Sequence, residues 1–302
     1  MPIRTASPQR DERGVLAERG ALITGASQGL GLAIARAFVL AGAEVMICAR
    51  DSALLELAQA ELVALARNEQ AVTSFVADVS DREDVGKLVE AADARLANLS
   101  VLVNNAGVQG PVGHLWEVDL DEWVRALEIN LIGSALLARA MIPRFERAGG
   151  GKLIQISGGG ATSPMEGLSA YAASKAAVVR LAETLSLELV SRRVDVNALA
   201  PGAMNTRMLD EVLAGGAERV GEAYYGRALE QKRNGGASPE RAADLAVWLA
   251  SARSDGITGK LLSAVWDPWE TLDEHRSDLR SDVYTLRRIV PADRGLDWGE
   301  PA

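Results

Sequence analysis

The fold of this 302-residue chain is decided by the stretch Thr24-Gly25-Ala26-Ser27-Gln28-Gly29-Leu30-Gly31. An apolar run at residues 21–24 leads into it, and residues 30–40, apolar on nearly every face, follow it. The first run is typical of a buried strand, and the second of a helix that packs closely on a sheet. Glycines at such a junction permit a sharp turn and bring the helix close to the strand. We interpret the stretch as the first strand-turn-helix junction of an α/β protein.

The same alternation continues to residue 265. Further strands are predicted at residues 44–49, 72–77, 99–103, 152–157, 194–199 and 261–265, and further helices at 52–67, 81–97, 121–147, 170–190 and 239–250. Most of the predicted strands are continuous apolar runs, as expected where helices cover both faces of a sheet. The pattern predicts a single domain with a Rossmann-like, doubly wound, seven-stranded parallel sheet flanked by helices.

Three segments lie outside this alternation. Residues 1–19 are polar and are expected to be flexible. Residues 206–236 form an insertion, predicted to be helical, after the sixth strand, where a substrate lid would lie. The C-terminal extension, residues 266–302, contains three tryptophans. We expect it either to cover the pocket mouth of its own or a neighbouring subunit, where Arg287 and Arg288 would meet an anionic substrate group, or to act as a packing arm between subunits.

Composition and charge exclude several classes of function. The chain is 48% hydrophobic and 24% charged, which is ordinary for a globular protein and excludes disorder throughout. Its net charge of −9, from 32 Lys and Arg against 41 Asp and Glu, argues against nucleic-acid binding. Cys48 is the only cysteine, and His114 and His275 are the only histidines, so we expect no intrachain disulfide and no metal site.

The beginning of the chain and its hydropathy bear on location. Residues 1–20 are dotted with charged side chains and hold no apolar stretch, and no uninterrupted apolar run reaches the roughly 18 residues that a membrane span needs. The sequence therefore predicts a cytoplasmic protein without a membrane partner.

The glycine-rich stretch also has a chemical meaning. The helix that follows it offers unpaired N–H groups and the positive end of its dipole, and both favour an anion. The glycines let the backbone approach a pyrophosphate. The position between strand and helix predicts dinucleotide binding by Gly25, Ser27, Gln28, Gly29, Leu30 and Gly31. A tight turn without a ligand is the alternative.

Further motifs follow in a fixed order. These are Asn104-Asn105-Ala106-Gly107 after the fourth predicted strand, Ser157 at the end of the fifth, Tyr171-Ala172-Ala173-Ser174-Lys175 at the start of a helix, and Pro201-Gly202 after the sixth strand. With the Gly-x3-Gly-x-Gly spacing, they resemble the short-chain dehydrogenase/reductase family over residues 20–265. The resemblance implies an oxidoreductase that moves a hydride between a nicotinamide cofactor and a small-molecule ketone or secondary alcohol. It also implies a homodimer or homotetramer.

The resemblance implies a catalytic group of Asn130, Ser157, Tyr171 and Lys175. Tyr171 and Lys175 lie four residues apart, about one helical turn. A free phenol has a pKa of about 10, which a nearby ammonium lowers, so we expect Tyr171 to exchange the proton. Ser157 would hold the substrate oxygen, and Lys175 would also bind the nicotinamide ribose. Asn130 would hold a water that links Lys175 to solvent; a paired core asparagine is the alternative.

The end of the second strand decides between the two nicotinamide cofactors. Family members that use NAD carry an acidic residue there, which binds the adenosine ribose. This chain has Ala49 followed by Arg50. A guanidinium fits phosphate oxygens, and Ser27 would add a hydroxyl, so NADP(H) is expected in preference to NAD(H). The alternative is that Arg50 merely begins a surface helix beside Asp51.

The remaining cofactor contacts come from the resemblance alone. Asp78 and Val79 follow the third strand, and Asp78 would contact the adenine; a helix cap with Ser80 is the alternative. The adenosine ribose would lie over Asn105, Ala106 and Gly107. The nicotinamide pocket would be shaped by Pro201, Gly202 and Thr206.

Two departures from the family pattern leave the substrate open. Three consecutive glycines, residues 158–160, follow Ser157, and the seventh strand runs into Ser263-Ala264-Val265-Trp266-Asp267 instead of an Asp-Gly-Gly-like end. A carbonyl reductase or alcohol dehydrogenase working with NADP(H) is favoured, in the direction of reduction. The alternatives are an epimerase or lyase that transiently oxidises a sugar derivative, and a protein that senses NADP(H) without turnover.

Overall fold

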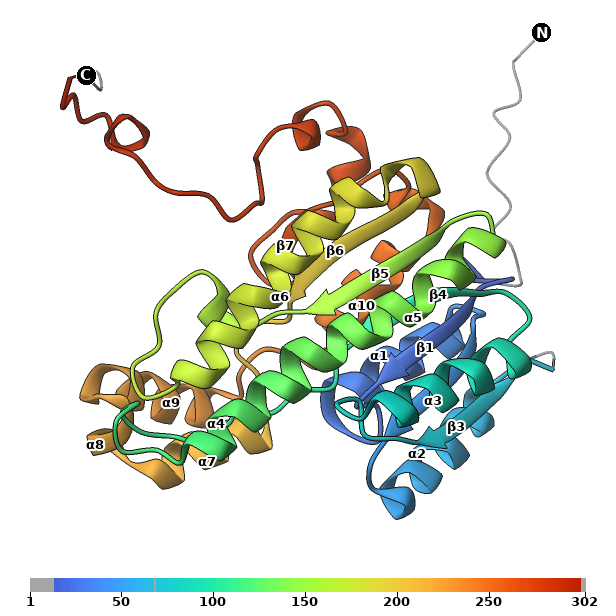
Figure 1. Cartoon of the computed structure of the whole chain (residues 1–302), viewed down its shortest axis with the longest axis horizontal. Coiled ribbons are helices and arrows are strands. Elements are labelled where there is room, and N and C mark those ends of the chain that lie inside the picture. The colour runs from blue at the N-terminus through green and yellow to red at the C-terminus, as the bar shows by residue number, and fades with distance from the viewer. Residues whose placement is uncertain (1–13, 68, 300–302) are drawn as a thin grey trace, which may run out of the picture.

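A computed structural model describes residues 14–67 and 69–299. One sheet of seven parallel strands has the order β3-β2-β1-β4-β5-β6-β7 (Figure 1). The strands are β1 (Gly20–Thr24), β2 (Glu44–Ala49), β3 (Val72–Val76), β4 (Leu99–Asn104), β5 (Gly151–Ile156), β6 (Val194–Ala200) and β7 (Leu261–Ser263). Because the strand order reverses between β1 and β4, the sheet is doubly wound. The predicted Rossmann-like fold is confirmed.

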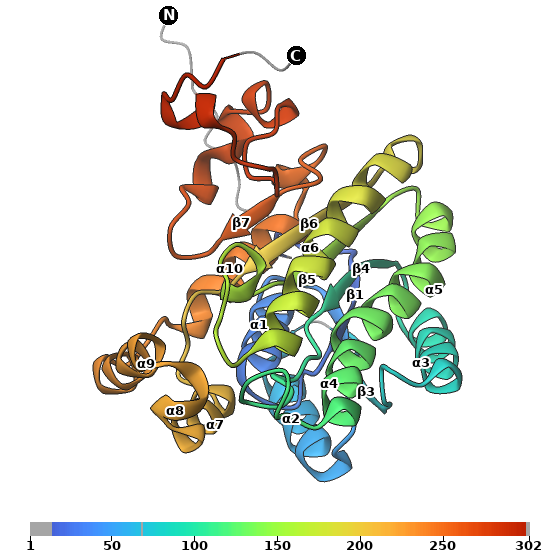
Figure 2. The ribbon, with the colours of Figure 1, turned by 60° about the vertical axis from the view of Figure 1, so that its left-hand side comes forward.

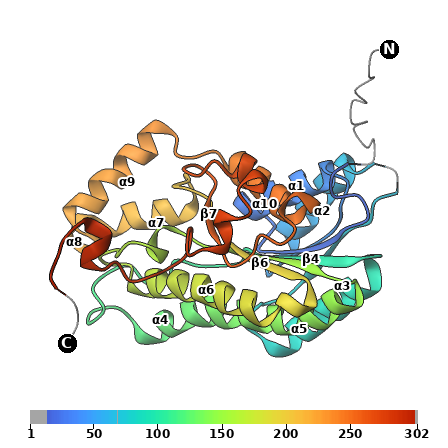
Figure 3. The same cartoon turned by 90° about the horizontal axis from the view of Figure 1, so that it is seen from above.

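Helices cover the sheet in two layers (Figure 3). On one face lie α1 (Gly29–Leu40), α2 (Ser52–Leu65) and α10 (Pro239–Ala250), and on the other α3 (Arg82–Arg95), α5 (Gly133–Arg147) and α6 (Ser169–Glu188). Phe38 and Trp248 are buried in the first layer, and Met141 and Phe145 in the second. Every residue of β1, β4 and β5 is buried, as expected of central strands covered on both faces, and the buried residues include the polar Lys152 and Gln155 of β5.

The helical segment between β4 and β5 is longer and less regular than the single helix predicted at 121–147. It consists of α4 (Leu120–Leu127), a π-helical turn η1 (Glu128–Ile132) and α5. Among the described residues, Leu120–Arg147 is the span whose length and apolar composition would suit a membrane crossing. However, Leu137 and Met141 of α5 are buried in the core of the sheet's second layer. Much of the apolar character of α5 therefore serves internal packing, whereas Val124 and Ile132 of the preceding turns are exposed.

The segment before β1 is only partly described. Residues 1–13, which the sequence predicts to be flexible, lie outside the described residues. The prediction is wrong for residues 14–19, because Leu16 is fully buried and its N–H donates to the carbonyl of Ala41 at 2.9 Å. Leu16 belongs to the hydrophobic core of the first layer and lies near the C-terminal end of α1.

The C-terminal extension continues the fold beyond β7. It contains short 3-10 helices, η5 (Trp269–Glu274), η6 (Asp278–Arg280) and η7 (Pro291–Arg294). Trp269 is buried against α10, and its ring lies 5.0 Å from the guanidinium of Arg241. The N–H of Leu286 donates to the carboxylate of Glu183 on α6 at 2.6 Å. Residues 266–286 are therefore part of the packed domain.

The last part of the extension does not cover the pocket of its own chain. Figures 1 and 2 show residues 287–299 running away from the body and apart from the helices of residues 206–236. Arg287 is held by Asp282 at 3.0 Å and by Asp293 at 2.8 Å. Within one chain, the expected meeting of Arg287 with a substrate anion is thus wrong, because two carboxylates of the extension already take its charge.

The extension also covers the outer edge of β7. The N–H of Leu261 donates to the carbonyl of Tyr284 at 2.8 Å, and the N–H of Ser263 donates to the carboxylate of Asp267 at 2.6 Å. The ammonium of Lys260 donates to two further carbonyls of the extension, at 2.7 and 3.0 Å. The edge strand thus finds its partners within the chain.

Candidate active site

The predicted cofactor residues come together at one edge of the sheet, because parallel strands all end there. They lie at the ends of β1 (Gly25 to Gly31), β2 (Arg50), β3 (Asp78, Val79), β4 (Asn105, Ala106, Gly107) and β6 (Pro201, Gly202, Thr206). Three helices, α7 (Arg207–Gly215), α8 (Ala217–Val220) and α9 (Glu222–Asn234), stand beside this edge (Figure 2). We call them the lid helices.

The glycine-rich turn is packed on one side and open on the other. Gly25 and Gly29 adopt φ values of +62° and +58°, which favour glycine. A Cβ on Gly25 would lie 2.8 Å from Cα of Ala106, so the turn packs backbone to backbone against the motif after β4. A Cβ on Gly29 would meet nothing within 4 Å, so the backbone is accessible from outside at that point.

The amino terminus of α1 fits an anion. Its N-cap residue, Gln28, makes no side-chain capping hydrogen bond, and the first turn holds no acidic residue. The first N–H groups of α1 therefore have no side-chain acceptor, and nothing acidic offsets the positive end of the helix dipole. A pyrophosphate would satisfy both needs, so the residues present fit a dinucleotide.

The motif after β4 ties the central strands together. The side-chain amide of Asn105 donates to the carbonyls of Thr24 and Gly25 at 2.8 and 3.0 Å. The hydroxyl of Thr24 accepts from the N–H groups of Asn105 and Ala106, both at 3.0 Å. Thr24 is a functional residue beyond those predicted from the sequence, and its only signal there is a hydroxyl at the last position of the first strand.

Arg50 and Asp78 lie beside each other at the ends of β2 and β3. Arg50 is exposed, and no ion pair or hydrogen bond joins its side chain to another described residue. Asp78 accepts from the hydroxyl of Ser80 at 2.6 Å and from Arg125 at 2.6 Å. Burial alone would raise the pKa of Asp78, yet these partners and the charge of Arg50 lower it. Asp78 contacts Ser80, but the cap of α3 is Asp81, so the helix-cap alternative is wrong; the adenine contact of Asp78 stays a prediction.

The hydroxyl of Tyr171 lies against Gly158, the residue that follows Ser157. Ser157 follows β5, and its Oγ is buried without a hydrogen-bond partner among the described residues. Tyr171 lies in the first turn of α6, and a Cβ on Gly158 would overlap its hydroxyl. The phenol thus lies against the backbone next to Ser157. Leaving a buried hydroxyl unpaired costs about 1–3 kcal/mol, and a substrate oxygen between the two groups would remove that cost.

Lys175 is buried one turn further along α6. Its Nζ donates to the carbonyl of Ile156 at 2.9 Å and lies 5.7 Å from the ring centroid of Tyr171. Burial lowers the pKa of Lys175 to about 8 and raises the pKa of Tyr171 to about 12. Burial is the main cause of the raised pKa of Tyr171, so the lowering expected from Lys175 does not appear in this structure.

Asn130 lies in the π-helical turn, a form of helix that often marks functional sites. Its amide donates to the carbonyl of Val108 at 2.8 Å and to the hydroxyl of Ser174 at 2.9 Å, and its Oδ1 accepts from the N–H of Val108 at 2.8 Å. Both of its side-chain N–H groups are used, so Asn130 joins the loop after β4 to α6. The alternative of a paired core asparagine is present, and the water-holding role stays a prediction.

The lid helices form a small apolar core with the site. Leu209, Val212 and Val220 are buried together with Leu168, and Tyr171 packs against them. At the base of the lid, the N–H of Ala237 donates to the carbonyl of Ala203 at 2.7 Å, which joins the two ends of the insertion. At Gly202, whose φ is +91°, a Cβ would lie 2.6 Å from the side chain of Val265. The insertion predicted at residues 206–236 is helical, and its role as a substrate lid stays a prediction.

Comparison with known proteins agrees with this geometry. The pattern of the short chain dehydrogenase family matches residues 19–215. A human protein, dehydrogenase/reductase SDR family member 4, is 34% identical over 261 residues, 85% of this chain and 90% of the relative. The 1-deoxy-11-beta-hydroxypentalenate dehydrogenase of Streptomyces exfoliatus is 40% identical over 201 residues, 66% of this chain and 72% of the relative.

Solved structures give the same answer. A gluconate 5-dehydrogenase from Burkholderia cenocepacia, solved with NADP and tartrate, superposes with a TM-score of 0.72 at 27% identity, over 83% of this chain and 95% of that one. A short-chain type dehydrogenase/reductase from Mycobacterium ulcerans superposes with a TM-score of 0.73 at 28% identity, over 82% and 88%. The chain belongs to the short-chain dehydrogenase/reductase family, and it is an oxidoreductase.

Proposed function

We propose that this oxidoreductase interconverts a ketone and a secondary alcohol with NADP(H), and that reduction is its favoured direction. The observation that carries the proposal is the buried hydroxyl of Ser157, which has no partner among the described residues, with the hydroxyl of Tyr171 lying against the neighbouring residue, Gly158. Two hydroxyls from different elements can both donate to one carbonyl oxygen, and such preorganised donors stabilise the charge that develops there.

The chemistry divides between the cofactor and the chain. A bound nicotinamide cofactor supplies the hydride in reduction and accepts it in oxidation. In reduction, Tyr171 donates its proton to the substrate oxygen while the carbonyl carbon gains the hydride, and Ser157 donates a hydrogen bond to the same oxygen. The buried ammonium of Lys175 stabilises the phenolate that remains. Asn130 holds α6 in position through Ser174.

The direct test follows the absorbance of NADPH and NADH with a panel of ketones and aldehydes. The proposed reductase consumes NADPH in proportion to the carbonyl added. An epimerase or lyase that oxidises its substrate transiently leaves the total of reduced cofactor unchanged. A sensor binds NADPH, seen as a change in the fluorescence of the cofactor, but turns over no member of the panel. Either of the last two outcomes contradicts the proposal.

The preference for NADP(H) is proposed from Arg50, whose exposed guanidinium makes no hydrogen bond or ion pair with another described residue at the end of β2. A charge-assisted hydrogen bond contributes about 1.5–3 kcal/mol, so Arg50→Ala is expected to raise the KM for NADPH about tenfold or more. The KM for NADH should stay within about twofold, since NADH has no phosphate at that position. Steady-state kinetics with both cofactors measure the two KM values in the wild type and in the variant. An equal rise for both cofactors would contradict the assignment.

The activity is expected to fall above about pH 8, the pKa to which burial lowers Lys175. Above that pH Lys175 loses its charge, whereas Tyr171, with a pKa of about 12, still carries the proton needed for reduction. The kcat/KM for a ketone should therefore decline on the alkaline side. Lys175→Arg keeps its charge and should show no such decline at its lower rate. A flat wild-type profile would contradict the expectation.

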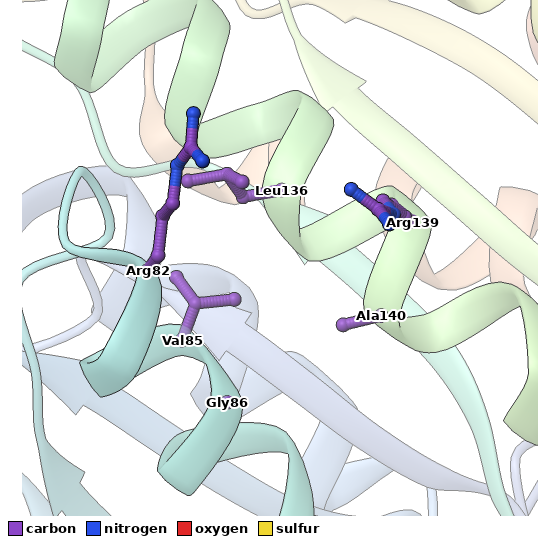
Figure 4. Close-up of a pocket in the computed structure, with 6 residues that line it drawn as sticks. All are labelled: Arg82, Val85, Gly86, Leu136, Arg139 and Ala140. Atoms are coloured by element: carbon purple, nitrogen blue, oxygen red, sulfur yellow. The ribbon is translucent and has the colours of Figure 1, made fainter.

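We also propose that two copies of this chain associate through the layer that contains α3 and α5. A groove of about 350 Å³ lies there, lined by Arg82, Val85, Gly86, Leu136, Arg139 and Ala140 (Figure 4). Exposed apolar side chains, Val124 and Ile132, extend along the preceding helical turns. A chain of net charge −9 offers acidic groups to the two arginines. Light scattering should give the mass of a dimer or tetramer, and Ile132→Asp should reduce it; a monomeric wild type contradicts the proposal.

A further inference from the structure

The lid helices bring a second tyrosine to the site. Tyr224 lies on α9, is half-buried, and packs on the same apolar cluster as Tyr171. Burial is the larger cause of the raised pKa of Tyr171, and the charge that Tyr224 would carry as a phenolate raises it further. The two phenols, 53 positions apart in the sequence, are therefore neighbours in the folded chain.

The hydroxyl of Tyr224 has no hydrogen-bond partner among the side chains and backbone groups of the described residues. Its ring is held from outside by Arg227, whose guanidinium lies 5.7 Å from the ring centroid. A half-buried phenol normally finds a partner for its hydroxyl, because an unpaired donor costs free energy. Unlike the buried hydroxyl of Ser157, that of Tyr224 is open to solvent, so a substrate that displaces the solvent has to supply its acceptor.

The surroundings of the two phenols are otherwise apolar. Val112, Met165 and Leu213 are the partly buried side chains that pack on the same cluster with Tyr224 and its neighbour Tyr225. A substrate that enters beside Tyr171 therefore meets mainly hydrocarbon on the lid side. A second oxygen on such a substrate would find a donor in Tyr224, whereas a purely apolar substrate would leave that donor unpaired.

We propose that Tyr224 determines substrate specificity by donating a hydrogen bond to a second oxygen of the substrate. The substrate class is then a ketone with an apolar body and an oxygen acceptor a few bonds from the reacting carbonyl, such as a 3-oxo ester. The inference rests on the proposed function, since it concerns the same site. A site built to hydrogen-bond a substrate group discriminates against analogues that lack the group, because its own polar group is then left unpaired.

A matched pair of ketones tests the inference. Ethyl 3-oxobutanoate and 2-heptanone have the same chain length and the same reacting methyl ketone, and they differ by the ester oxygens. The ester is the more reactive ketone in any enzyme, so the readout is the change in the ratio of the two kcat/KM values between variants. Tyr224→Phe removes only the hydroxyl. It should lower kcat/KM for the ester about tenfold, and leave that for 2-heptanone within about twofold.

The adjacent tyrosine supplies the control. Tyr225→Phe removes a hydroxyl from the same helix and the same cluster, and should leave the ratio within about twofold of the wild type. An unchanged rate with 2-heptanone in Tyr224→Phe also shows that Tyr171 is still in place. If Tyr224→Phe slows both ketones equally, Tyr224 acts on Tyr171 or on the fold, and the inference is overturned. It is also overturned if the variant slows neither.

The inference and the proposed function fail in different ways. A wild-type enzyme that reduces other ketones of the panel but neither member of this pair has another substrate class, which overturns the inference and leaves the proposed function intact. A wild type that reduces no carbonyl with either cofactor overturns both. In that case Tyr171→Phe has no activity to remove, which identifies the proposed function as the source of the failure.

Discussion

Tyr171→Phe is expected to lower kcat for ketone reduction by about 10²–10⁴-fold, the range that a positioned general acid contributes. The variant lacks only the hydroxyl that lies against Gly158 beside Ser157. The fold should persist, because the ring of Phe can still pack on the apolar cluster that contains Leu168 and Val212. Steady-state and single-turnover rates with NADPH measure the loss, and NADPH fluorescence shows that the cofactor still binds.

A tyrosine outside the site provides the comparison. Tyr284→Phe removes a hydroxyl from the C-terminal extension, where the backbone carbonyl of residue 284 and not the phenol pairs with β7. This variant should keep kcat within about twofold of the wild type. A Tyr171→Phe enzyme that retained more than about a tenth of wild-type kcat would remove Tyr171 from the catalytic role.

Gly158→Ala should be nearly as damaging, through a different physical cause. The added Cβ would overlap the hydroxyl of Tyr171, so the phenol has to move away from Ser157. Backbone strain is not involved, because the φ of Gly158 is −172°, which any residue adopts. A displacement of about 1 Å of a catalytic group can cost about a hundredfold in rate, and we expect a loss of that size in kcat/KM.

The neighbouring glycine makes this prediction specific. A Cβ on Gly159 would meet nothing within 4 Å, so Gly159→Ala adds the same methyl group without displacing Tyr171. It should leave kcat/KM within about twofold of the wild type. Circular dichroism and thermal unfolding confirm that both variants fold. Equal losses in the two variants would mean that flexibility of the glycine run, and not the position of Tyr171, governs the rate.

The strands of the sheet, and the motifs at the edge where the cofactor would bind, can be predicted from local sequence. The apolar runs at residues 21–24 and 44–49 end within a residue of β1 and β2, because a strand covered on both faces has to be apolar throughout. The placement of Asn105 beside Gly25 follows from that, since the carboxyl ends of neighbouring parallel strands meet. Motifs at strand ends can therefore be placed without coordinates.

Features that depend on contacts between segments far apart in the sequence could not be predicted in this way. Tyr224 lies 53 positions after Tyr171 in a polar helix, and only the folded lid brings the two together. The pKa of Tyr171 was predicted from one neighbour, Lys175, whereas the burial that dominates comes from several segments at once. The partners of Asn130 likewise depend on a π-helical turn, for which the apolar sequence around it gives no signal.

The covered edge of β7 has a consequence for the synthesis of the protein. Until residues 267–284 have emerged from the ribosome, the N–H groups of Leu261 and Ser263 have none of the acceptors that the finished chain gives them. An open edge strand is a template for pairing with another nascent or misfolded chain. The segment after β7 thus protects this edge from pairing with another chain, and the protection is complete only once residues 267–284 have been synthesised.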